Sequence, residues 1–400
     1  MDFIPFIPYT SISLYLNNYR INYNQKFDKY AYFWKVDLLY KIGITLIPGV
    51  GDVNAKKVIA YCGGVEAVFK EKKKALLKIP GVGLTLAESI LKNKVLSRAE
   101  KEIAFLEKYK ISPLFYLDKQ YPERLKHCVD SPVMVYYKGN ADLNVQKVIG
   151  IVGTRSATDY GKKICREIVE NLAPLNVMVV SGLAYGIDVH AHKAALQAGL
   201  NTVGVLGHGL DRLYPAVHRA TAEKMIKQGG LLTDFMSETK FGPENFPKRN
   251  RIVAGMVDAI VVIEAARDGG ALITASIANS YNRDVFAVPG RIDDHFSEGC
   301  NNFIKTNRAA LINSANDIVY IMGWEEKKNK KPENVQKKLF VELSDEEKSV
   351  VDLLNGASSM SIDMISINVN LQASKVAAVL LNLEFLGIIK CLPGKMYQLL

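Results

Sequence analysis

The sequence has few cysteines, no long hydrophobic run and no secretion signal. Its five cysteines are scattered: Cys62, Cys128, Cys165, Cys300 and Cys391. None forms a Cys-x-x-Cys pair, so neither a disulfide framework nor a zinc site is indicated. No run of about eighteen apolar residues occurs, and the N-terminus lacks the basic, apolar and small-residue order of a signal peptide. We therefore expect a cytoplasmic protein with no membrane partner.

The common nucleotide-binding fingerprints are also missing. No Gly-x-Gly-x-x-Gly segment is followed about 20 residues later by an acidic residue, which argues against a nicotinamide or flavin dinucleotide. No Gly-x-x-x-x-Gly-Lys-Ser/Thr segment occurs either, which argues against a nucleoside triphosphate. His190 and His192 lie on a predicted helix and point to different sides, so they make a poor metal pair. We predict no cofactor and no metal.

The composition indicates a globular protein with an anionic partner. The chain has 400 residues, of which 48% are hydrophobic, and this is enough to bury a core in roughly two to four domains. Lys and Arg number 51 against 41 for Asp and Glu. Such a balance favours nucleic acid or a membrane surface as partner, although general solubility explains it too.

The N-terminal part divides into an extension and a helical domain. Residues 1–35 are rich in Tyr, Asn, Phe and Ile without a helical or strand period, so we expect an extension that is disordered or not made in the cell. Within residues 36–115, "LIPGVGDVNAKKVIAYC" (46–62) is followed by the related "KIPGVGLTLAESIL" (78–91). Each copy predicts a helix, a Pro-Gly-x-Gly turn and a second helix. The pair resembles two helix-hairpin-helix motifs of a SAM-like domain, and it fits a helical bundle without DNA contact equally well.

Residues 116–322 predict a Rossmann-like domain. Short apolar runs bounded by glycine alternate with helical stretches, as is typical of a doubly wound, mostly parallel sheet covered on both faces. The predicted fold class is therefore α/β. The predicted strands are 148–154, 177–182, 202–207, 231–235, 259–265 and 285–290.

The C-terminal part divides into a linker and a small domain. Residues 323–342 are rich in lysine and poor in apolar residues, which predicts a linker. Residues 343–400 predict three helices and a terminal hairpin, similar to a winged helix, and Ser344 with Glu347 has the spacing of a capping box. The third predicted helix offers only Lys375 as a cation, so a protein contact is favoured over DNA reading.

The loops that follow the predicted strands form the candidate site, because doubly wound sheets bind ligands outside the carboxyl ends of their strands. After the first strand, Gly153 permits close approach and Arg155 offers a fork for phosphate. Ser156 or Thr158 can cap the helix that follows. The loop after the second strand (181–188) is again small and polar at the start of a helix.

The segment "FPKRNR" (246–251) follows the fourth predicted strand at the same edge. Pro247 suits the first turn of a helix, and the three cations of the segment repel one another there unless an anion or carboxylates compensate them. Phe246 offers a face for a base, and stacking beside a charged track holds single strands without sequence preference. For Arg249 a structural carboxylate partner is equally open, because its spacing to Val253 places it toward the buried side.

The ordered motifs resemble the DprA/Smf family of DNA-processing proteins. In the order and spacing of that family they are VGTRSAT, SGLAYGIDVHAH, GLDRLYP, FPKRNRIVAG, DGGALITA, VFAVPG and EGCNNFI. The flanking helical and winged-helix-like regions are similar as well, so the resemblance covers roughly residues 40–400. It implies a homodimer through the Rossmann-like domain, not an enzyme, that binds and protects single-stranded DNA entering a bacterial cell. It also implies that the protein loads the recombinase RecA during natural transformation.

The resemblance, together with the loop after the second predicted strand (181–188), gives a set of candidate DNA-binding residues. It gives no catalytic residues. Thr154 stands where the family often has Ser. Residues 307–312 lack the Gly-Ala that is common there, so the site is not extended to that helix. The candidates are Gly153, Thr154, Arg155, Ser156, Ser181, Gly182, Phe246, Lys248, Arg249, Asn250 and Arg251.

Two other functions stay open at this point. Rossmann-like hydrolases of the lysine-decarboxylase-like family act on nucleotide derivatives with an acid near a Gly-rich phosphate loop. Here Glu264 and Asp268 lie near Gly269 and Gly270. The other alternative is a regulator that binds duplex DNA, which the few donors of the third C-terminal helix oppose.

Overall fold

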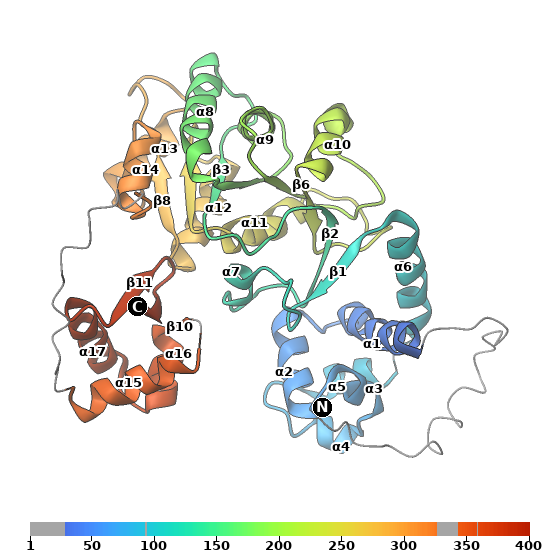
Figure 1. Ribbon diagram of the computed structural model, residues 1–400. Helices are drawn as coiled ribbons and strands as arrows, with labels where there is room; N and C mark the ends of the chain where they lie inside the picture. Colours follow the sequence, from blue (N-terminus) through green and yellow to red (C-terminus); the bar gives the residue numbers. More distant parts are fainter. Residues whose placement is uncertain (1–28, 93, 326–342, 358) are drawn as a thin grey trace.

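Figure 1 shows a helical domain, a central sheet domain and a small C-terminal domain in chain order. The computed structural model describes residues 29–92, 94–325, 343–357 and 359–400. Residues 1–28 of the predicted extension and 326–342 of the predicted linker lie outside the described residues. Helix α1 (Lys29–Leu46) begins inside the predicted extension. The predicted boundary at residue 35 is therefore wrong, because α1 packs along helix α6, where Lys35 pairs with Glu107.

The helical domain contains both predicted hairpins. Gly49 and Gly81 have φ angles of 81° and 82°, a conformation that favours glycine. Gly51 and Gly83 cap the helices that follow with the same extended backbone. The internal repeat is therefore confirmed, because the two turns have nearly the same backbone conformation. Besides α1, the helices are α2 (Asp52–Cys62), α3 (Val65–Lys70), α4 (Lys73–Leu76), α5 (Leu84–Leu91) and α6 (Leu96–Tyr109).

The central domain is a nine-stranded sheet in the order β1-β2-β6-β5-β4-β3-β7-β8-β9. The predicted strands are all present and pair in parallel, so the Rossmann-like prediction is confirmed. They are β3 (Val148–Val152), β4 (Met178–Ser181), β5 (Thr202–Val205), β6 (Gly229–Thr233), β7 (Ala259–Val262) and β8 (Asp284–Ala287). The sequence did not predict the antiparallel strands β1 (Ser112–Phe115) and β2 (Met134–Gly139) or the short β9 (Ala310–Leu311).

Strands β1 and β2 belong to two cores at once, because successive strand residues point to opposite faces. Leu114 and Tyr137 pack into the core of the sheet domain. Phe115 and Tyr136 pack into the core of the helical domain. The predicted boundary at residue 116 therefore does not separate the domains, since β1 lies before it.

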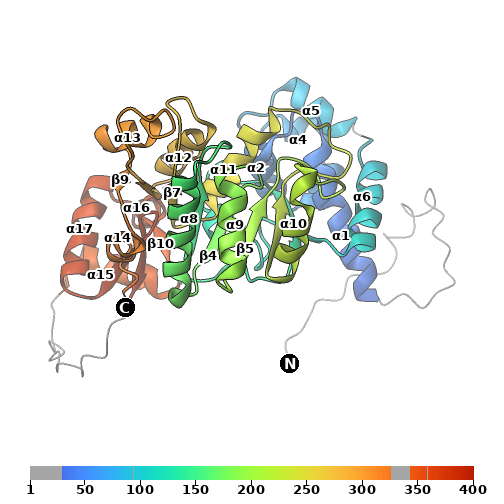
Figure 2. The same ribbon diagram turned by 90° about the horizontal axis from the view of Figure 1, so that it is seen from above.

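Helices cover both faces of the sheet (Figure 1, Figure 2). One face carries α8 (Asp159–Leu172), α9 (Ile187–Gln197), α10 (Arg219–Lys227) and α14 (Ala315–Ile321). The other face carries α7 (Glu123–Lys126), α11 (Asn245–Gly255), α12 (Gly270–Ser280) and α13 (Glu298–Lys305). Strands β4, β5 and β6 extend to one side of β3, and β7, β8 and β9 extend to the other. The strand order therefore reverses between β3 and β7.

The C-terminal domain has its own core and the predicted elements. The capping box of Ser344 and Glu347 is present. Trp324 packs into the sheet domain, so that domain runs past the predicted end at 322. The elements are α15 (Asp345–Asn355), β10 (Met360–Ser361), α16 (Ile362–Val369), α17 (Ala373–Phe385), β11 (Ile389–Leu392) and β12 (Met396–Leu399). Among the described residues no single helix is long and apolar enough to span a membrane; only the sharply bent pair α16 and α17 passes by length and composition.

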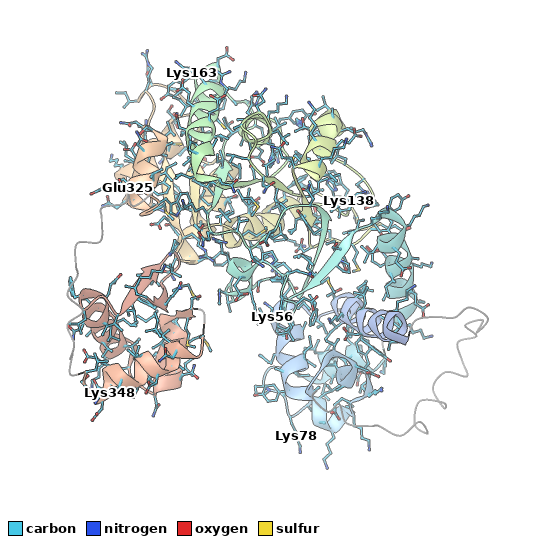
Figure 3. The ribbon with its side chains drawn as sticks, viewed as in Figure 1. Lys56, Lys78, Lys138, Lys163, Glu325 and Lys348 are labelled. Atoms are coloured by element: carbon cyan, nitrogen blue, oxygen red, sulfur yellow. The ribbon has the colours of Figure 1, made fainter. Side chains whose placement is uncertain are left out.

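The helical domain is joined to the sheet domain by partly buried ion pairs around Arg251. The guanidinium of Arg251, on α11, lies 2.9 Å from a carboxylate oxygen of Asp234 after β6 and 2.9 Å from one of Asp52 at the start of α2. Asp52 also accepts a hydrogen bond from the N–H of Val133. Figure 3 places Lys56 at the same junction, where it donates to Ser131. The first hairpin therefore ends in a helix whose start is fixed to the sheet domain.

A second junction fixes the loop that follows β6. Glu102 of α6 is only 1% exposed, and its carboxylate accepts hydrogen bonds from the N–H and the hydroxyl of Ser237. Arg98 pairs with Glu102 and donates to the carbonyl oxygen of Ser237. The helical domain thus holds the segment from β6 to α11 at two points, namely Ser237 and Arg251, and Arg251 in turn pairs with Asp234 within the sheet domain.

We expect Arg251→Met to lower the stability of the chain. Burial raises the pKa of Asp234 while Arg251 opposes this shift, so removing the cation leaves a buried carboxylate without its partner. Breaking a buried pair in this way costs up to about 3 kcal/mol. Arg291→Met is the matched control, because Arg291 pairs with Asp293 in full contact with solvent. Denaturant unfolding measures both, and equal midpoints for the two variants would contradict the role given to Arg251.

Candidate functional site

A cleft of about 600 Å³ opens at the carboxyl ends of the strands, where the strand order reverses. This is the place where doubly wound sheets bind their ligands. Its lining includes Gly153 after β3, Gly182 after β4, Tyr214 after β5, Phe246 on α11 and Gly270 at the start of α12. Loops that are far apart in the sequence therefore meet at one opening.

The loop after β3 is fixed by Glu264. The N–H of Thr154 donates to the carbonyl oxygen of Glu264 at 2.7 Å. The Glu264 carboxylate is buried and accepts hydrogen bonds from the N–H and the hydroxyl of Thr158. Thr158 also caps α8. The sequence offered Ser156 or Thr158 for this role. Arg155 and Ser156 are left exposed on a loop whose base is held in place.

An aromatic ring and a cation meet at the cleft. The guanidinium carbon of Arg155 lies 5.5 Å from the centroid of the Phe246 ring, which is within the range of a cation–π contact. The ring centroids of Tyr214 and Phe241 lie 6.2 and 5.8 Å from that of Phe246. Because Phe246 is only partly buried, the opening combines a positive charge with an accessible aromatic surface.

Arg249 lies at the base of the cleft and is 6% exposed. Its guanidinium donates to the carbonyl oxygen of Val205. Gly182 separates it from Asp188, since a Cβ on Gly182 would lie 2.3 Å from both Arg249 Nη1 and Asp188 Oδ2. Burial lowers the pKa of the Arg249 guanidinium, Asp188 opposes this, and Arg155 lowers the pKa further. Arg249 is therefore a buried cation that an acidic neighbour compensates.

Comparison with known proteins identifies the family. Residues 112–323 match the family model described as DNA recombination-mediator protein A. Residues 340–395 match the DprA winged helix domain. The chain belongs to the DprA/Smf family. The sequence prediction of this family is confirmed, as is that of a C-terminal winged helix.

Individual DprA/Smf proteins agree with this assignment. Protein Smf of Synechocystis is 35% identical over 291 residues, which cover 71% of this chain and 72% of that protein. The DNA processing protein DprA of Streptococcus pneumoniae is 34% identical over 63% of this chain and 96% of that protein. The X-ray structure of DprA from Streptococcus pneumoniae superposes with a TM-score of 0.62 over 70% of this chain and 97% of that one, at 32% identity.

The cleft brings together most of the residues that the DprA/Smf resemblance assigns. Lys248 and Ser156 are exposed near it but do not line it. The candidates that line it are Gly153, Thr154, Arg155, Gly182, Phe246, Arg249 and Asn250.

Two of the predicted DNA-binding residues need correction. Ser181 is fully buried, and its hydroxyl donates to the carbonyl oxygen of Ile151 at 2.5 Å. Arg251 points to the helical domain and pairs with Asp52 and Asp234. Neither side chain is free for a ligand, because each satisfies a partner inside the protein. For Arg249 the alternative of a carboxylate partner describes its surroundings better, because Asp188 lies close to it. Arg249 also lines the cleft.

Sequence reasoning missed two aromatic residues of the cleft, Tyr214 and Phe241. Tyr214 lies in the segment GLDRLYP, which follows a strand at the same edge, so the rule that selected the other loops could have found it. Phe241 gave no such signal, because it lies in an irregular loop. Gly269 and Gly270 were noticed only for the hydrolase alternative, and they line the same cleft.

His190 and His192 both make hydrogen bonds inside the protein. His192 is buried, with Nδ1 2.7 Å from the Thr202 hydroxyl and Nε2 2.5 Å from the Gly182 carbonyl oxygen. Burial lowers its pKa to about 4. His190 bonds the carbonyl oxygen of Gly186. No group of three or more His, Cys, Asp or Glu residues with the arrangement of a metal site occurs in the described parts of the chain.

We expect Gly182→Ala to destabilise the protein by roughly 1–3 kcal/mol, because the added methyl group forces apart the Arg249 guanidinium and the Asp188 carboxylate. Gly270→Ala is the control in the same cleft, since a Cβ there meets nothing within 4 Å. Thermal melting of the two variants checks this. A Gly182→Ala variant as stable as Gly270→Ala would show that the Gly182 backbone has room to move.

Proposed function

We propose that this chain binds single-stranded DNA in the cleft with little sequence preference. The observation that carries the proposal is the meeting of Arg155 and Phe246 at the carboxyl ends of parallel strands. A guanidinium binds phosphate and a partly exposed ring stacks on a base, which together hold a single strand. Membership of a family of DNA-processing proteins supports the same ligand.

The rest of the lining supports binding without sequence reading. Gly270 lets the backbone approach a ligand, since nothing lies within 4 Å of its Cβ position, and Val253 and Ile273 add apolar surface. Specific recognition of bases needs several side-chain donors and acceptors aimed at base edges. A lining dominated by glycine and apolar groups is better suited to a polymer recognised by its backbone and its ring faces.

Arg155 covers the ring face on which a base would stack. A small cavity of about 20 Å³ borders Arg155 and Phe246, and its wall includes Leu183, Tyr185 and Pro215. A space of this size holds about one water molecule. We infer that the guanidinium turns outward to a phosphate when a base takes its place against Phe246.

The hydrolase alternative receives less support. The carboxylate that it requires from Glu264 is buried and bonded to Thr158. Asp268 is exposed, and no His or Cys lies next to it in the sequence. The same residues are explained by a loop that Glu264 shapes for binding.

The wider biological role rests on the family resemblance. We propose that the chain acts in the cytoplasm as a homodimer through the sheet domain, protects DNA taken up during natural transformation and loads RecA on it. Assembly of RecA on a strand covered with single-stranded DNA-binding protein tests the loading step. If the chain binds the strand but does not accelerate assembly, the loading role is wrong while the binding function stands.

We expect Arg155→Ala and Lys248→Ala to weaken oligo-dT binding and to flatten its dependence on salt, by roughly 0.7 in log–log slope for each lost phosphate contact. Phe246→Ala should weaken binding by roughly 1–3 kcal/mol with an unchanged slope, because stacking releases no counterions. Fluorescence anisotropy at several salt concentrations measures both effects, with melting curves as the check on folding.

Lys138→Ala is the matched control for these variants. Lys138 also lies over an aromatic ring, that of Tyr109, at 5.9 Å. It lies on β2, pairs in register with Leu231 in the middle of β6 (Figure 3), and is not among the residues that line the cleft. Folded Arg155→Ala and Lys248→Ala variants that bind oligo-dT as tightly as Lys138→Ala does would rule out the proposed cleft.

A further inference from the structure

Three aromatic side chains form a continuous cluster at the cleft, of which the proposed function uses only Phe246. The centroids of Tyr214 and Phe241 lie 5.0 Å apart, and each lies within 6.2 Å of Phe246. All three line the cleft. Tyr214 is 47% exposed and Phe241 is 38% exposed. Rings with this much apolar surface in water, side by side in a concave site, are suited to cover an apolar ligand group.

The position of Tyr214 is set by a buried histidine. The N–H of Tyr214 donates to Nε2 of His208 at 3.1 Å. Because Nε2 accepts, the ring proton is on Nδ1, which donates to the carbonyl oxygen of Gly209 at 2.9 Å. His208 is 1% exposed and its ring packs near that of Phe241. The neutral imidazole of His208 therefore holds the loop of Tyr214 beside the ring of Phe241.

The position of Phe241 is set by the helical domain. Phe241 lies in the loop that Glu102 of α6 holds through Ser237. Two separate supports thus act on the loops of Tyr214 and Phe241, whereas Phe246 lies on α11 itself. A cluster that merely filled space would not need two buried polar supports for rings that stay partly exposed.

We propose that Tyr214 and Phe241 form a second stacking position, which takes another nucleobase of the strand whose first base stacks on Phe246, and that His208 is its positioning residue. Because the planes of Tyr214 and Phe241 meet at 59°, the base stacks on the face of one ring and contacts the edge of the other. This inference rests on the proposed single-strand binding function and deepens it. The cleft then recognises at least two bases of one strand rather than a single base.

The ring angles explain why such a site selects single strands. The planes of Phe241 and Phe246 meet at 88°, and those of Tyr214 and Phe246 meet at 52°. Bases that stack on these rings are therefore steeply tilted to each other. Neighbouring bases of a duplex are parallel and about 3.4 Å apart, so a duplex cannot occupy both positions without unstacking.

Photochemical cross-linking tests the second position directly on the full chain. Oligo-dT with 5-iododeoxyuridine in place of thymidine forms adducts with aromatic side chains that stack on the base, and mass spectrometry identifies the modified peptides. We expect adducts on Phe246 and on Tyr214 or Phe241. Adducts on Phe246 alone would overturn the second position and leave the proposed function intact. Absence of saturable oligo-dT binding would instead refute the proposed function.

Substitutions give an independent test with a matched control. Tyr214→Leu and Phe241→Leu should each weaken oligo-dT binding about fivefold or more, the equivalent of losing one stacked base, with an unchanged salt slope. Tyr320→Leu removes a 76% exposed tyrosine on α14, outside the cleft lining, and should bind as the parent does. Affinities of Tyr214→Leu and Phe241→Leu equal to that of Tyr320→Leu would overturn the proposal.

The positioning role of His208 has its own signature. His208→Ala removes the acceptor for the Tyr214 N–H, and we expect the adduct at the second position, on Tyr214 or Phe241, to be lost together with affinity. His208→Gln places an amide oxygen near the Nε2 position and should restore both. If His208→Ala keeps the adduct at the second position, or if His208→Gln fails to restore it although the variant melts like the parent, the positioning role is wrong.

Discussion

The shape of the cleft depends on how helix α11 places the charges along its first seven residues. Arg251 is held by Asp234 and Asp52, and this contact joins the first hairpin of the helical domain to the strand that precedes the cleft loop. Without a carboxylate on each side, a guanidinium in this half-buried position would lack compensation for its lost hydration. With both, α11 is fixed in rotation as well as in position. That rotation decides which neighbouring side chains reach the cleft.

Four consecutive residues of α11 point in four directions, because each residue turns the helix by about 100°. Lys248 faces solvent, Arg249 is buried, Asn250 lines the cleft and Arg251 faces the helical domain. The density of charge in FPKRNR therefore has no single explanation. Lys248 is exposed to solvent, Arg249 is compensated at the base of the cleft by Asp188, and Arg251 joins two domains. The cations of one basic segment therefore lie in three different environments.

Much of this fold could be predicted from the sequence, for physical reasons that also show where prediction stops. Parallel strands such as Val148–Val152 are buried on both faces and give continuous apolar runs, so they were recognised. The antiparallel strand Ser112–Phe115 is short, begins with Ser-Pro and pairs only with a partner two dozen residues away, so no local pattern revealed it. The loops of the site followed from the sheet rule. The partners of Arg251 and Ser181 could not be predicted, because they depend on contacts across domains and between strands.

Strands β1 and β2 contribute side chains to two cores, and this links the unfolding of the helical domain to that of the sheet domain. Phe115 and Tyr136 belong to the helical core while Leu114 and Tyr137 belong to the sheet core, on the same pair of strands. Melting of either core exposes the back of the strands that the other core needs. We therefore expect the helical and sheet domains to unfold as one cooperative unit. The C-terminal domain has a core made from its own helices and hairpin, so we expect it to unfold separately.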